Sequence, residues 1–461
     1  MSRTTDVVVL GGGPAGLGAA HQLAGRGVRV TLFEAGGQVG GLAGSTTVGG
    51  MSVDFGSHRL HPSIAPEILA VLDGLPGVEL QRRQRHGRIR LTDRWVAFPL
   101  RVPDVLRHLP PTLAAGMARD ALLGPLRRPR RDSFDEVLRA GVGPTLARRF
   151  YFPYARKIWG VAPALLSGEQ ARRRVGANSV VSIARRALEG RRDPPWFWYP
   201  RRGFGALAEG LARAARARGA DVRVDTPVTG VERTSTGWAV RSGDGTVVYA
   251  RDVWSTLPVT RLTTMLQPAP LDYVRRDGAA LRYRAMLLVY LVLDQPRYTP
   301  FDAHYLPEPW TPVTRISEPK NYRDGPDPAS TTVLCAELPC APDDRWWSSS
   351  DRELSAVVAD TCEQAGLPQP RPRAVTVHRR RYAYPIATAD SAARLARIER
   401  WVGSLPGVLT LGRQGLFAHD NTHHALAMAW AAAEAFDPVS GLDVPAWTAA
   451  RAGFRTHVVE D

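Results

Sequence analysis

The chain opens with a short apolar run at residues 7–10, which is followed at once by glycines. A run this short and this apolar predicts a strand buried on both faces, as in a parallel sheet. A helix is expected to begin near Pro14 and to end at the glycines of residues 25–27. A second apolar run at 28–33 predicts a second strand that ends at Glu34. The opening therefore predicts a strand–helix–strand unit.

The pattern then changes to a helix-leaning, arginine-rich region that lasts to about residue 195. Within it, Ser133 and Glu136 are spaced as a capping box that opens a helix at 134–140. An amphipathic helix is expected at 207–218, where Gly219 stops it. Short strands are expected next, at 222–224, 228–233, 238–241, 247–250 and 253–257.

The last part of the chain alternates short apolar runs with proline-rich loops. Between residues 262 and 395, runs such as 286–293 and 332–338 predict a mostly antiparallel sheet that carries a substrate. Residues 408–413 are then expected to form a buried strand that reaches a glycine, and residues 425–435 a helix.

The glycines of the first turn have the spacing of a dinucleotide site. Gly11, Gly13 and Gly16 form G-x-G-x-x-G between the expected strand and helix. The first glycine allows the tight turn, the second lets the backbone approach a pyrophosphate, and the third allows close helix packing. Glu34 follows Gly11 by 23 residues, close to the offset at which an acid binds a ribose 2′-hydroxyl. A bound dinucleotide with a free 2′-hydroxyl is expected.

Composition changes this picture little. The chain has 461 residues, of which 44% are hydrophobic and 23% charged, values that are ordinary for a globular protein. The net charge of +16 would suit a nucleic acid or an anionic membrane. However, Lys157 and Lys320 are the only lysines, and the arginines are spread along the chain without a nucleic-acid-binding motif. We expect no nucleic-acid partner.

One basic stretch raises the question of a lipid surface. Residues 126–131 contain four arginines and follow an apolar-rich segment at 105–123. A weak peripheral contact with an anionic bilayer is one interpretation, and a helix capping a pocket with solvated arginines outside is the other. No apolar stretch is long enough to span a bilayer, and the strand signal at Asp6 leaves no room for a secretory leader, so a cytoplasmic protein is expected. The oligomeric state stays open.

The cysteines indicate neither a disulfide framework nor a zinc site. They form no Cys-x-x-Cys pair, and three is an odd number. They are expected to be buried thiols: Cys335, Cys340 and Cys362.

A second glycine pair follows the acid, in the sequence Glu34-Ala35-x4-Gly40-Gly41-Leu42. This arrangement resembles the flavoprotein amine-oxidase superfamily, in which such a pair lies along FAD. Four further blocks resemble the branch of that superfamily that contains protoporphyrinogen-oxidase-like oxidoreductases and UDP-galactopyranose mutases: residues 54–61, 152–160, 382–385 and 412–421. The resemblance covers nearly the whole chain and implies FAD as the cofactor.

The resemblance also implies the fold class. We expect an α/β protein with an α+β substrate domain, in which a Rossmann-type FAD-binding domain with a parallel sheet is interleaved with a mixed helical and antiparallel-sheet substrate domain. The expected boundaries are 1–62, 196–262 and 396–450 for the FAD domain, 63–195 and 263–395 for the substrate or cap domain, and 451–461 for a C-terminal tail.

Several residues are implied to contact the flavin. In relatives, the block matching residues 56–61 lies beside the isoalloxazine ring, so His58 or His61 would transfer a proton or only support the loop. The helix after Asn421 would aim its N-terminus at the ring and stabilise negative charge there. The expected FAD contacts are Gly11, Gly13, Pro14, Ala15, Gly16, Glu34, Ala35, Gly40, Gly41, Leu42, Gly56, Ser57, His58, Arg59, Val228, Thr256, Gly412, Arg413, Asn421 and Thr422.

The same likeness implies a substrate side. Trp159, Arg315 and Tyr384 fall in blocks that line it in relatives. Arg174 belongs to a run at 172–174 that would clamp a diphosphate or remain a solvated charge run.

Three histidines near the C-terminal block invite a metal interpretation. His419, His423 and His424 include an i, i+4 pair. No matching carboxylate or cysteine accompanies them in the pattern, and the flavin motif already explains their place, so no metal is predicted.

Two chemistries follow from the resemblance. The first is an FAD-dependent oxidoreductase that takes a hydride from a small organic substrate onto flavin N5. The alternative is a redox-neutral nucleotide-sugar mutase. Phe417 and Asp420 stand where the mutases have two diphosphate-binding tyrosines, which favours the oxidoreductase. The prenyl-protein escort proteins, which share the fold without catalysis, lack the cofactor motifs present here. The substrate itself is left open.

Overall fold

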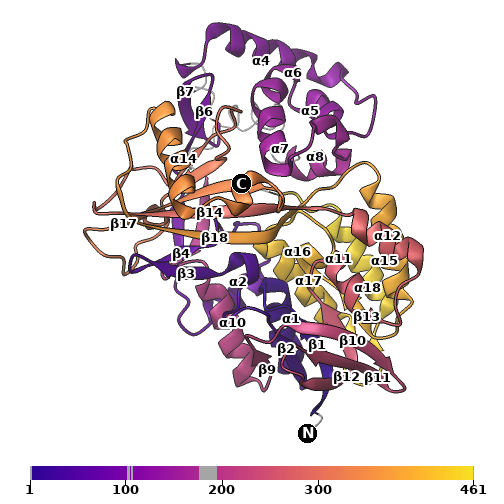
Figure 1. The fold of residues 1–461 in the computed structure, drawn as a ribbon. Coiled ribbons are helices and arrows are strands. Elements are labelled where there is room, and N and C mark those ends of the chain that lie inside the picture. The colour runs from indigo at the N-terminus through magenta and orange to yellow at the C-terminus, as the bar shows by residue number, and fades with distance from the viewer. Residues whose placement is uncertain (1–2, 101–103, 105–106, 176–194, 460–461) are drawn as a thin grey trace.

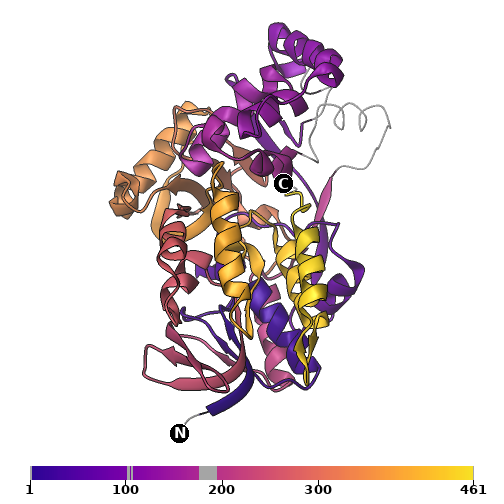
Figure 2. The ribbon, with the colours of Figure 1, turned by 90° about the vertical axis from the view of Figure 1, so that its right-hand side faces the viewer.

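The structure is a computed structural model that describes residues 3–100, 104, 107–175 and 195–459. Figure 1 shows two sheets, one above the other, with a group of helices over the upper sheet. Figure 2 shows the N-terminus at the far end of the lower layer, whereas the C-terminal end lies between that layer and the upper helices. The predicted mixed α/β architecture is confirmed.

The lower sheet has the strand order β13-β10-β11-β12-β1-β2-β9, and β19 pairs with β12. The pairs β1–β12, β1–β2, β2–β9 and β12–β19 are parallel, whereas β10, β11 and β12 form an antiparallel meander. Residues 7–10 of β1 are fully buried, as their apolar run predicts. The strands are β1 (Arg3–Leu10), β2 (Val30–Phe33), β9 (Asp221–Arg223), β10 (Val228–Thr234), β11 (Gly237–Ser242), β12 (Val247–Ser255), β13 (Leu266–Gln267) and β19 (Val408–Thr410).

Three helices pack together beside this sheet. They are α1 (Pro14–Gly25), α10 (Ala206–Ala217) and α17 (Thr422–Glu434). Gly18 of α1 brings the helices close, since a Cβ there would lie 3.0 Å from the ring of Trp430 in α17. The helices predicted in these regions are confirmed, with slightly different ends.

The upper sheet has the order β18-β14-β17-β16-β15-β6-β7. All of its pairs are antiparallel except β15 with β6, so the mostly antiparallel prediction is confirmed. All three cysteines are buried thiols, as expected. The strands are β6 (Gly87–Leu91), β7 (Arg94–Phe98), β14 (Tyr283–Leu293), β15 (Ala303–Tyr305), β16 (Arg315–Ser317), β17 (Thr332–Cys340) and β18 (Pro372–Pro385).

A group of helices, which we call the cap helices, lies over one end of the upper sheet (Figure 1). Their shared core includes Phe134, Leu138, Phe150 and Trp159. The main cap helices are α4 (Pro111–Leu123), α5 (Phe134–Gly141), α7 (Phe152–Trp159) and α8 (Gly168–Val175).

Two local predictions are wrong. The helix at 134–140 exists as α5, but the capping box does not form, because the Ser133 hydroxyl donates to Asp135 Oδ1 at 2.7 Å instead of accepting at the N-terminus of α5. Residues 247–257 give one strand, β12, rather than two. Asp252, at the apparent interruption, pairs in register with Val7 of β1, and this backbone pairing continues the strand through the charged positions.

The expected tail at 451–461 also differs. Residues 451–454 are the end of α18 (Val444–Phe454), so the helix extends past the predicted boundary. The chain then turns toward α8, where the Val459 N–H donates to the Arg173 carbonyl oxygen at 2.7 Å. Val459 is only 3% exposed, so the last described residue is fixed against the cap helices.

Candidate functional site

The glycine fingerprint forms a tight turn between β1 and α1. Gly11 has a φ of +100°, and a Cβ there would lie 2.4 Å from Thr256 Oγ1. A Cβ on Gly16 would lie 2.0 Å from the Gly11 carbonyl oxygen, so α1 packs as closely as a bare backbone allows. A Cβ on Gly13, in contrast, would meet no atom within 4 Å. The space at the α1 N-terminus is therefore open, and the helix dipole favours a phosphate there.

Glu34 ties this turn to the end of β2. Its Oε2 accepts a hydrogen bond from the Gly12 N–H at 2.8 Å, and its Oε1 accepts one from the Gly36 N–H at 2.9 Å. Each oxygen keeps a further lone pair, so the carboxylate can still accept from a ribose hydroxyl. The second glycine pair lies against the same turn, because the Gly40 N–H donates to the Gly12 carbonyl oxygen at 2.7 Å.

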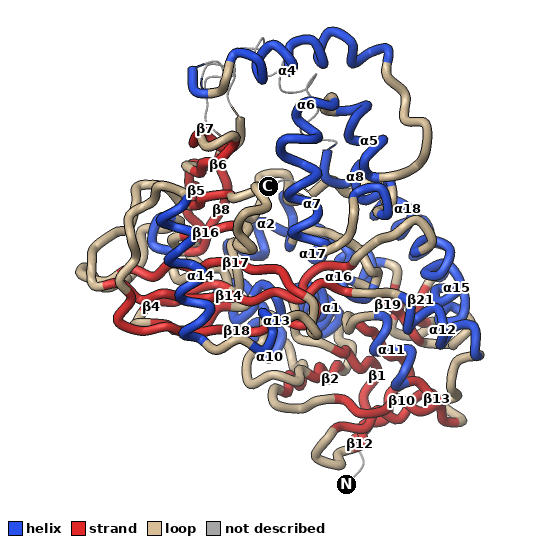
Figure 3. Tube along the Cα trace, turned by 45° about the horizontal axis from the view of Figure 1, so that its top comes forward, coloured by secondary structure: helices blue, strands red, loops and turns tan. Residues whose placement is uncertain are grey.

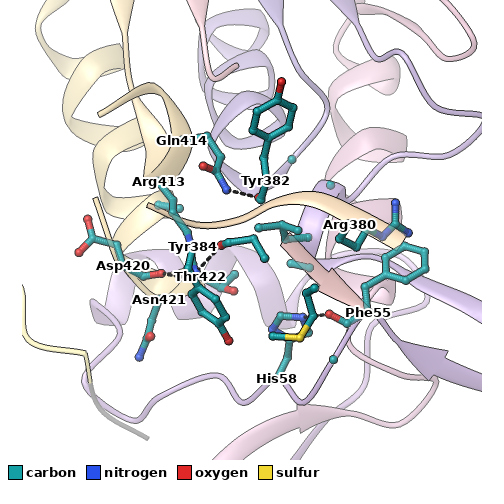
Figure 4. A pocket seen from close by; sticks show the side chains of 18 of the residues that line it. Phe55, His58, Arg380, Tyr382, Tyr384, Arg413, Gln414, Asp420, Asn421 and Thr422 are labelled. Atoms are coloured by element: carbon teal, nitrogen blue, oxygen red, sulfur yellow. Dashed lines mark hydrogen bonds between the residues drawn. The ribbon is translucent and has the colours of Figure 1, made fainter. Parts of the chain in front are cut away.

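A cavity of about 500 Å³ extends from this turn to the upper sheet, a size typical of small-molecule sites. Figure 4 shows part of its wall, where β18 meets the loop before α17. The predicted residues that line it are Gly11, Gly13, Pro14, Ala15, Glu34, Gly41, Leu42, Gly56, Ser57, His58, Arg59, Thr256, Arg315, Tyr384, Gly412, Arg413, Asn421 and Thr422.

Four predicted FAD contacts do not lie on this wall: Gly16, Ala35, Gly40 and Val228. Gly16 and Gly40 are placed behind it by the turn contacts described above. Val228 belongs to β10, and both β11 and β12 separate that strand from β1.

The two candidate catalytic histidines have different positions. His58 lies on the cavity wall, with Nε2 at 3.1 Å from the Phe55 carbonyl oxygen and its ring stacked on Phe204. Burial lowers the pKa of His58, so the ring is neutral, with Nε2 donating to the carbonyl and Nδ1 left as the acceptor. His61 is not among the lining residues. Its Nδ1 lies 2.7 Å from Ser63 Oγ, and the preceding residue, Leu60, forms a β-bridge with Trp198.

Arg315 forms a buried ion pair at the substrate side. Its Nε and Nη2 donate to the Glu337 carboxylate at 2.9 and 2.8 Å, and the Ser57 N–H donates to the same carboxylate at 2.8 Å. Burial works against the charged guanidinium, yet Glu337 and nearby tyrosines hold the pKa of Arg315 above its usual range. Glu337 was not predicted from the sequence, because it lies 280 residues from Ser57 along the chain.

Arg59 is a second buried guanidinium on the wall. Its Nη2 lies 3.3 Å from Asp302 Oδ1, and its nitrogens donate to the hydroxyls of Tyr305 and Tyr322 at 3.2 and 3.3 Å. Arg315 Nη1 also reaches Tyr305, at 3.5 Å. The two guanidiniums therefore share the Tyr305 hydroxyl and lie close together on the cavity wall.

The other end of the cavity is built around Tyr384. Arg413 donates to the Asp420 carbonyl oxygen at 3.0 Å and to the Ala383 carbonyl oxygen at 2.7 Å, and lies over the Tyr384 ring (Figure 4). The ring of His419 stacks on Tyr384 with centroids 5.0 Å apart. Asn421 and Thr422 begin α17 on the wall, so the helix directs its N-terminus to the cavity as expected.

The remaining substrate-side predictions fit less well. Trp159 is 2% exposed and is not among the lining residues. It packs edge-on against His419, and His419 does line the cavity. Arg173 is not a solvated charge, because its side chain is 12% exposed and pairs with Glu169 and Asp420. Arg172 pairs with Asp132. Arg174 belongs to α8, but its side chain lies outside the described part of the chain.

The histidine cluster does have a carboxylate, contrary to the sequence interpretation. Asp420 Oδ1 lies 3.9 Å from His424 Nδ1, and Asp420 Oδ2 lies 3.6 Å from Nδ1 of His457. The rings of His424 and His457 stack almost parallel, at 11°, so their in-plane nitrogen lone pairs run side by side and do not converge on one point. His419 faces Tyr384 instead. The arrangement does not favour one metal ion.

Further wall residues were not predicted to lie on the cavity. The principal ones are Tyr154, His419, Asp420 and Val459, together with the arginines of β18 at 379–381. Tyr154, His419 and Asp420 fall in blocks that the sequence singled out, but a pattern does not reveal which side chains of a block turn toward a cavity.

Comparison with known proteins decides the family. The sequence profile described as flavin containing amine oxidoreductase matches residues 14–423. The chain belongs to the flavin-containing amine oxidoreductase family. Its curated relatives include the coproporphyrinogen III oxidase of Mycobacterium leprae, 28% identical over 317 residues, which cover 64% of this chain and 68% of that protein. Putrescine oxidase of Kocuria rosea is 44% identical over 82 residues, which cover 18% and 17% of the two chains.

Solved structures agree on the fold of this flavoprotein. A reduced UDP-galactopyranose mutase has a TM-score of 0.79 at 21% identity, with 93% of each chain covered. A putrescine oxidase bound to putrescine has a TM-score of 0.67 at 18% identity, with 94% of this chain and 99% of that chain covered. Within the described residues, no helix combines the length and apolar character needed to cross a bilayer.

The cofactor of this flavoprotein is FAD, and the residues fit it. Gly13 leaves room for a pyrophosphate at the N-terminus of α1, and Glu34 stands at the end of β2 where the ribose is expected. The N-terminus of α17, which packs beside α1, reaches the same cavity. One cavity therefore holds both the phosphate-binding turn and a helix dipole suited to a reduced ring.

Proposed function

We propose that this flavin-dependent oxidoreductase acts on an organic substrate that carries carboxylate or similar anionic groups. Bound FAD supplies the chemistry by accepting a hydride at its N5. The chain itself binds the anionic groups, orients the carbon to be oxidised and takes up the released proton.

The charge of the cavity wall carries this proposal. Arginines outnumber acidic residues seven to three among the lining residues. Two of the three acids already have arginine partners, Glu337 with Arg315 and Asp420 with Arg173. A wall of this kind concentrates anions. The arginines are Arg59, Arg85, Arg315, Arg379, Arg380, Arg381 and Arg413, and the acids are Glu34, Glu337 and Asp420.

The two curated relatives differ in this respect. Putrescine is a diamine and is dicationic near neutral pH, so the net positive charge of the wall would repel it. Coproporphyrinogen III carries several propionates, and guanidiniums bind carboxylates bidentately. A polycarboxylate of the porphyrinogen type suits this wall better than a diamine.

His58 is the proposed proton acceptor. Its ring is neutral and its Nε2 is held by the Phe55 carbonyl oxygen, so Nδ1 offers a lone pair. A neutral imidazole near the reacting carbon takes the proton that is released when a hydride leaves an N–H or C–H substrate. His61, which lies off the wall, has no part in this proposal.

The test is anaerobic reduction of the bound flavin, followed by its absorbance. Coproporphyrinogen III is expected to bleach the oxidised flavin, whereas putrescine at the same concentration leaves it oxidised. Reduction by putrescine and not by the porphyrinogen would refute the proposed substrate class.

The mutase alternative shares the preference for an anion and needs its own control. The reduced protein is incubated with UDP-galactopyranose, and the sugar is analysed for ring contraction. No conversion is expected, since Phe417 and Asp420 stand where the resemblance to the mutases implies two diphosphate-binding tyrosines, and neither side chain carries a phenolic hydroxyl. Conversion that depends on reduced flavin would establish the mutase instead.

A further inference from the structure

The outer side of α4 carries exposed leucines. Leu122 and Leu126 are each 81% exposed, and Leu123 is 43% exposed. α4 continues directly into the turn η2 (Gly124–Leu126), so Leu122 and Leu126 stand one helical turn apart on the same side. Figure 3 shows α4 along the outer edge of the cap helices.

The opposite side of α4 is firmly packed, so this exposure does not come from a loose helix. Leu113 is buried, and the Asp120 carboxylate accepts the Thr145 N–H at 2.7 Å. A Cβ on Gly116 would lie only 3.0 Å from Thr145 Oγ1. At about 100° per residue, Leu122 points away from Leu113. The leucines therefore lie on the side of α4 that faces away from its buried residues, Leu113 and Asp120.

Arginines surround these leucines. Arg119 has a side chain that is 67% exposed, and Arg128, Arg130 and Arg131 are also exposed. The nearby Asp120 is buried and pairs with Arg127 at 2.8 Å and with Arg119 at 3.7 Å, so one carboxylate faces two guanidiniums and leaves an excess of positive charge. Among the described residues, no ion pair to an acid involves Arg128, Arg130 or Arg131. We call these residues the α4 patch: Arg119, Leu122, Leu123, Leu126, Arg128, Arg130 and Arg131.

We infer that the α4 patch docks this protein onto an anionic lipid bilayer. Stable attachment needs two signals, and the patch offers both: apolar side chains that can enter the acyl boundary and guanidiniums that remain among the headgroups. The sequence left a second interpretation, a helix that caps a pocket with solvated arginines outside. No described residue of α4 lines the cavity, and that interpretation does not explain the exposure of Leu122 and Leu126.

A second copy of the chain is a poorer occupant. A symmetric dimer through this surface would place the patch against itself, so the arginines of one copy would face those of the other. The overall charge of +16 likewise favours an anionic surface. This inference does not depend on the proposed substrate.

The experiment is vesicle flotation with the FAD-loaded full chain. Vesicles of phosphatidylcholine are compared with vesicles that also contain phosphatidylglycerol. The protein is expected to float with the anionic vesicles, to remain in solution with the neutral ones, and to detach as salt is raised. The double variant Leu122→Ser/Leu126→Ser is expected to bind anionic vesicles about tenfold more weakly or worse.

Matched controls separate the patch from general charge. Leu271→Ser changes a leucine that is 60% exposed elsewhere, and the triple change of Arg233, Arg241 and Arg276 to Gln removes three exposed charges outside the patch. Both should bind like the parent, whereas Arg128, Arg130 and Arg131 changed to Gln should bind about tenfold more weakly.

Three outcomes would overturn the inference. The first is no flotation with anionic vesicles. The second is an equal loss in the control and patch arginine variants, which would indicate non-specific charge. The third is a concentration-dependent dimer that Leu122→Ser/Leu126→Ser abolishes, which would make the patch a contact between copies. Flavin absorbance and thermal unfolding of each variant verify that the fold is retained.

Discussion

Replacing Gly13 by alanine should separate folding from cofactor binding. Gly13 has a φ of −77° and a ψ of 178°, which any residue adopts, and the added Cβ would meet no atom within 4 Å. The apoprotein should therefore fold normally, with a gain of up to about 1 kcal/mol from the stiffer unfolded chain. The methyl group instead occupies the space through which a pyrophosphate approaches the backbone N–H groups.

The expected loss in FAD affinity follows from the bonds that this methyl prevents. A hydrogen bond to a charged acceptor contributes about 1.5–3 kcal/mol, so losing one or two near Gly13 costs about 3 kcal/mol. That corresponds to an affinity about a hundredfold weaker. The assay titrates the apoprotein with FAD and follows the quenching of flavin fluorescence, while thermal unfolding of the apoprotein is measured separately.

Two matched glycines make the result decisive. Gly230→Ala also adds a Cβ in open space without a positive φ, but in a strand away from the cavity, so FAD affinity should stay unchanged. Gly16→Ala should lower apoprotein stability, because its Cβ would lie 2.0 Å from a carbonyl oxygen. If Gly13→Ala bound FAD like the parent protein, or if it unfolded the apoprotein, the assignment of the phosphate to this turn would be wrong.

Three further predictions follow. Asp54 accepts the Phe204 N–H at 2.9 Å in a buried site, so Asp54→Ala should reduce the free energy of unfolding by about 3 kcal/mol in urea titrations; a loss below about 1 kcal/mol would contradict this. Burial lowers the pKa of His304 from 6.5 to about 3, so below pH 6.5 protons bind the unfolded chain preferentially. The free energy of unfolding therefore decreases as the pH is lowered. At about pH 5 the free energy of unfolding is lower by about 2 kcal/mol, and His304→Gln should remove this pH-dependent loss. If the pH dependence of unfolding were the same in the variant, the reasoning would be refuted. Arg59→Gln combined with Asp302→Asn should raise KM for an anionic substrate about tenfold while the flavin spectrum stays unchanged, and an unaltered KM would remove Arg59 from the binding site.

The cofactor half of the site could be predicted from the sequence because its geometry is local. The turn at Gly11 and Gly13 depends on which residues lack a side chain, and the sequence states this directly. The position of Glu34 depends only on the lengths of one helix and one strand. The dinucleotide prediction therefore needs only a short local segment, whereas the choice of FAD rests on the further blocks that carry the family resemblance.

The same local reasoning failed where two local options have similar energies. Ser133 is a good N-cap in pattern, but its hydroxyl finds Asp135 two residues on and the box is lost. Arg251 and Asp252 look like a break between strands, yet pairing with β1 holds them in the ladder. Tertiary pairing overrides a propensity difference of a few tenths of a kcal/mol.

The substrate half could not be predicted, because it is assembled from segments that meet only after folding. The Glu337 carboxylate on β17 accepts hydrogen bonds from Arg315 of β16 and from the Ser57 N–H. No spacing of residues in the chain predicts this contact. His419 lines the cavity, where its ring stacks on Tyr384. His61, which the resemblance placed beside the flavin ring, instead contacts Ser63. A local glycine motif thus indicates the cofactor, whereas substrate recognition depends on which charged side chains folding brings together. The excess of arginine on the wall arises only in the folded chain, and it supports the proposal of a polycarboxylate rather than a diamine, which the glycine turn does not address.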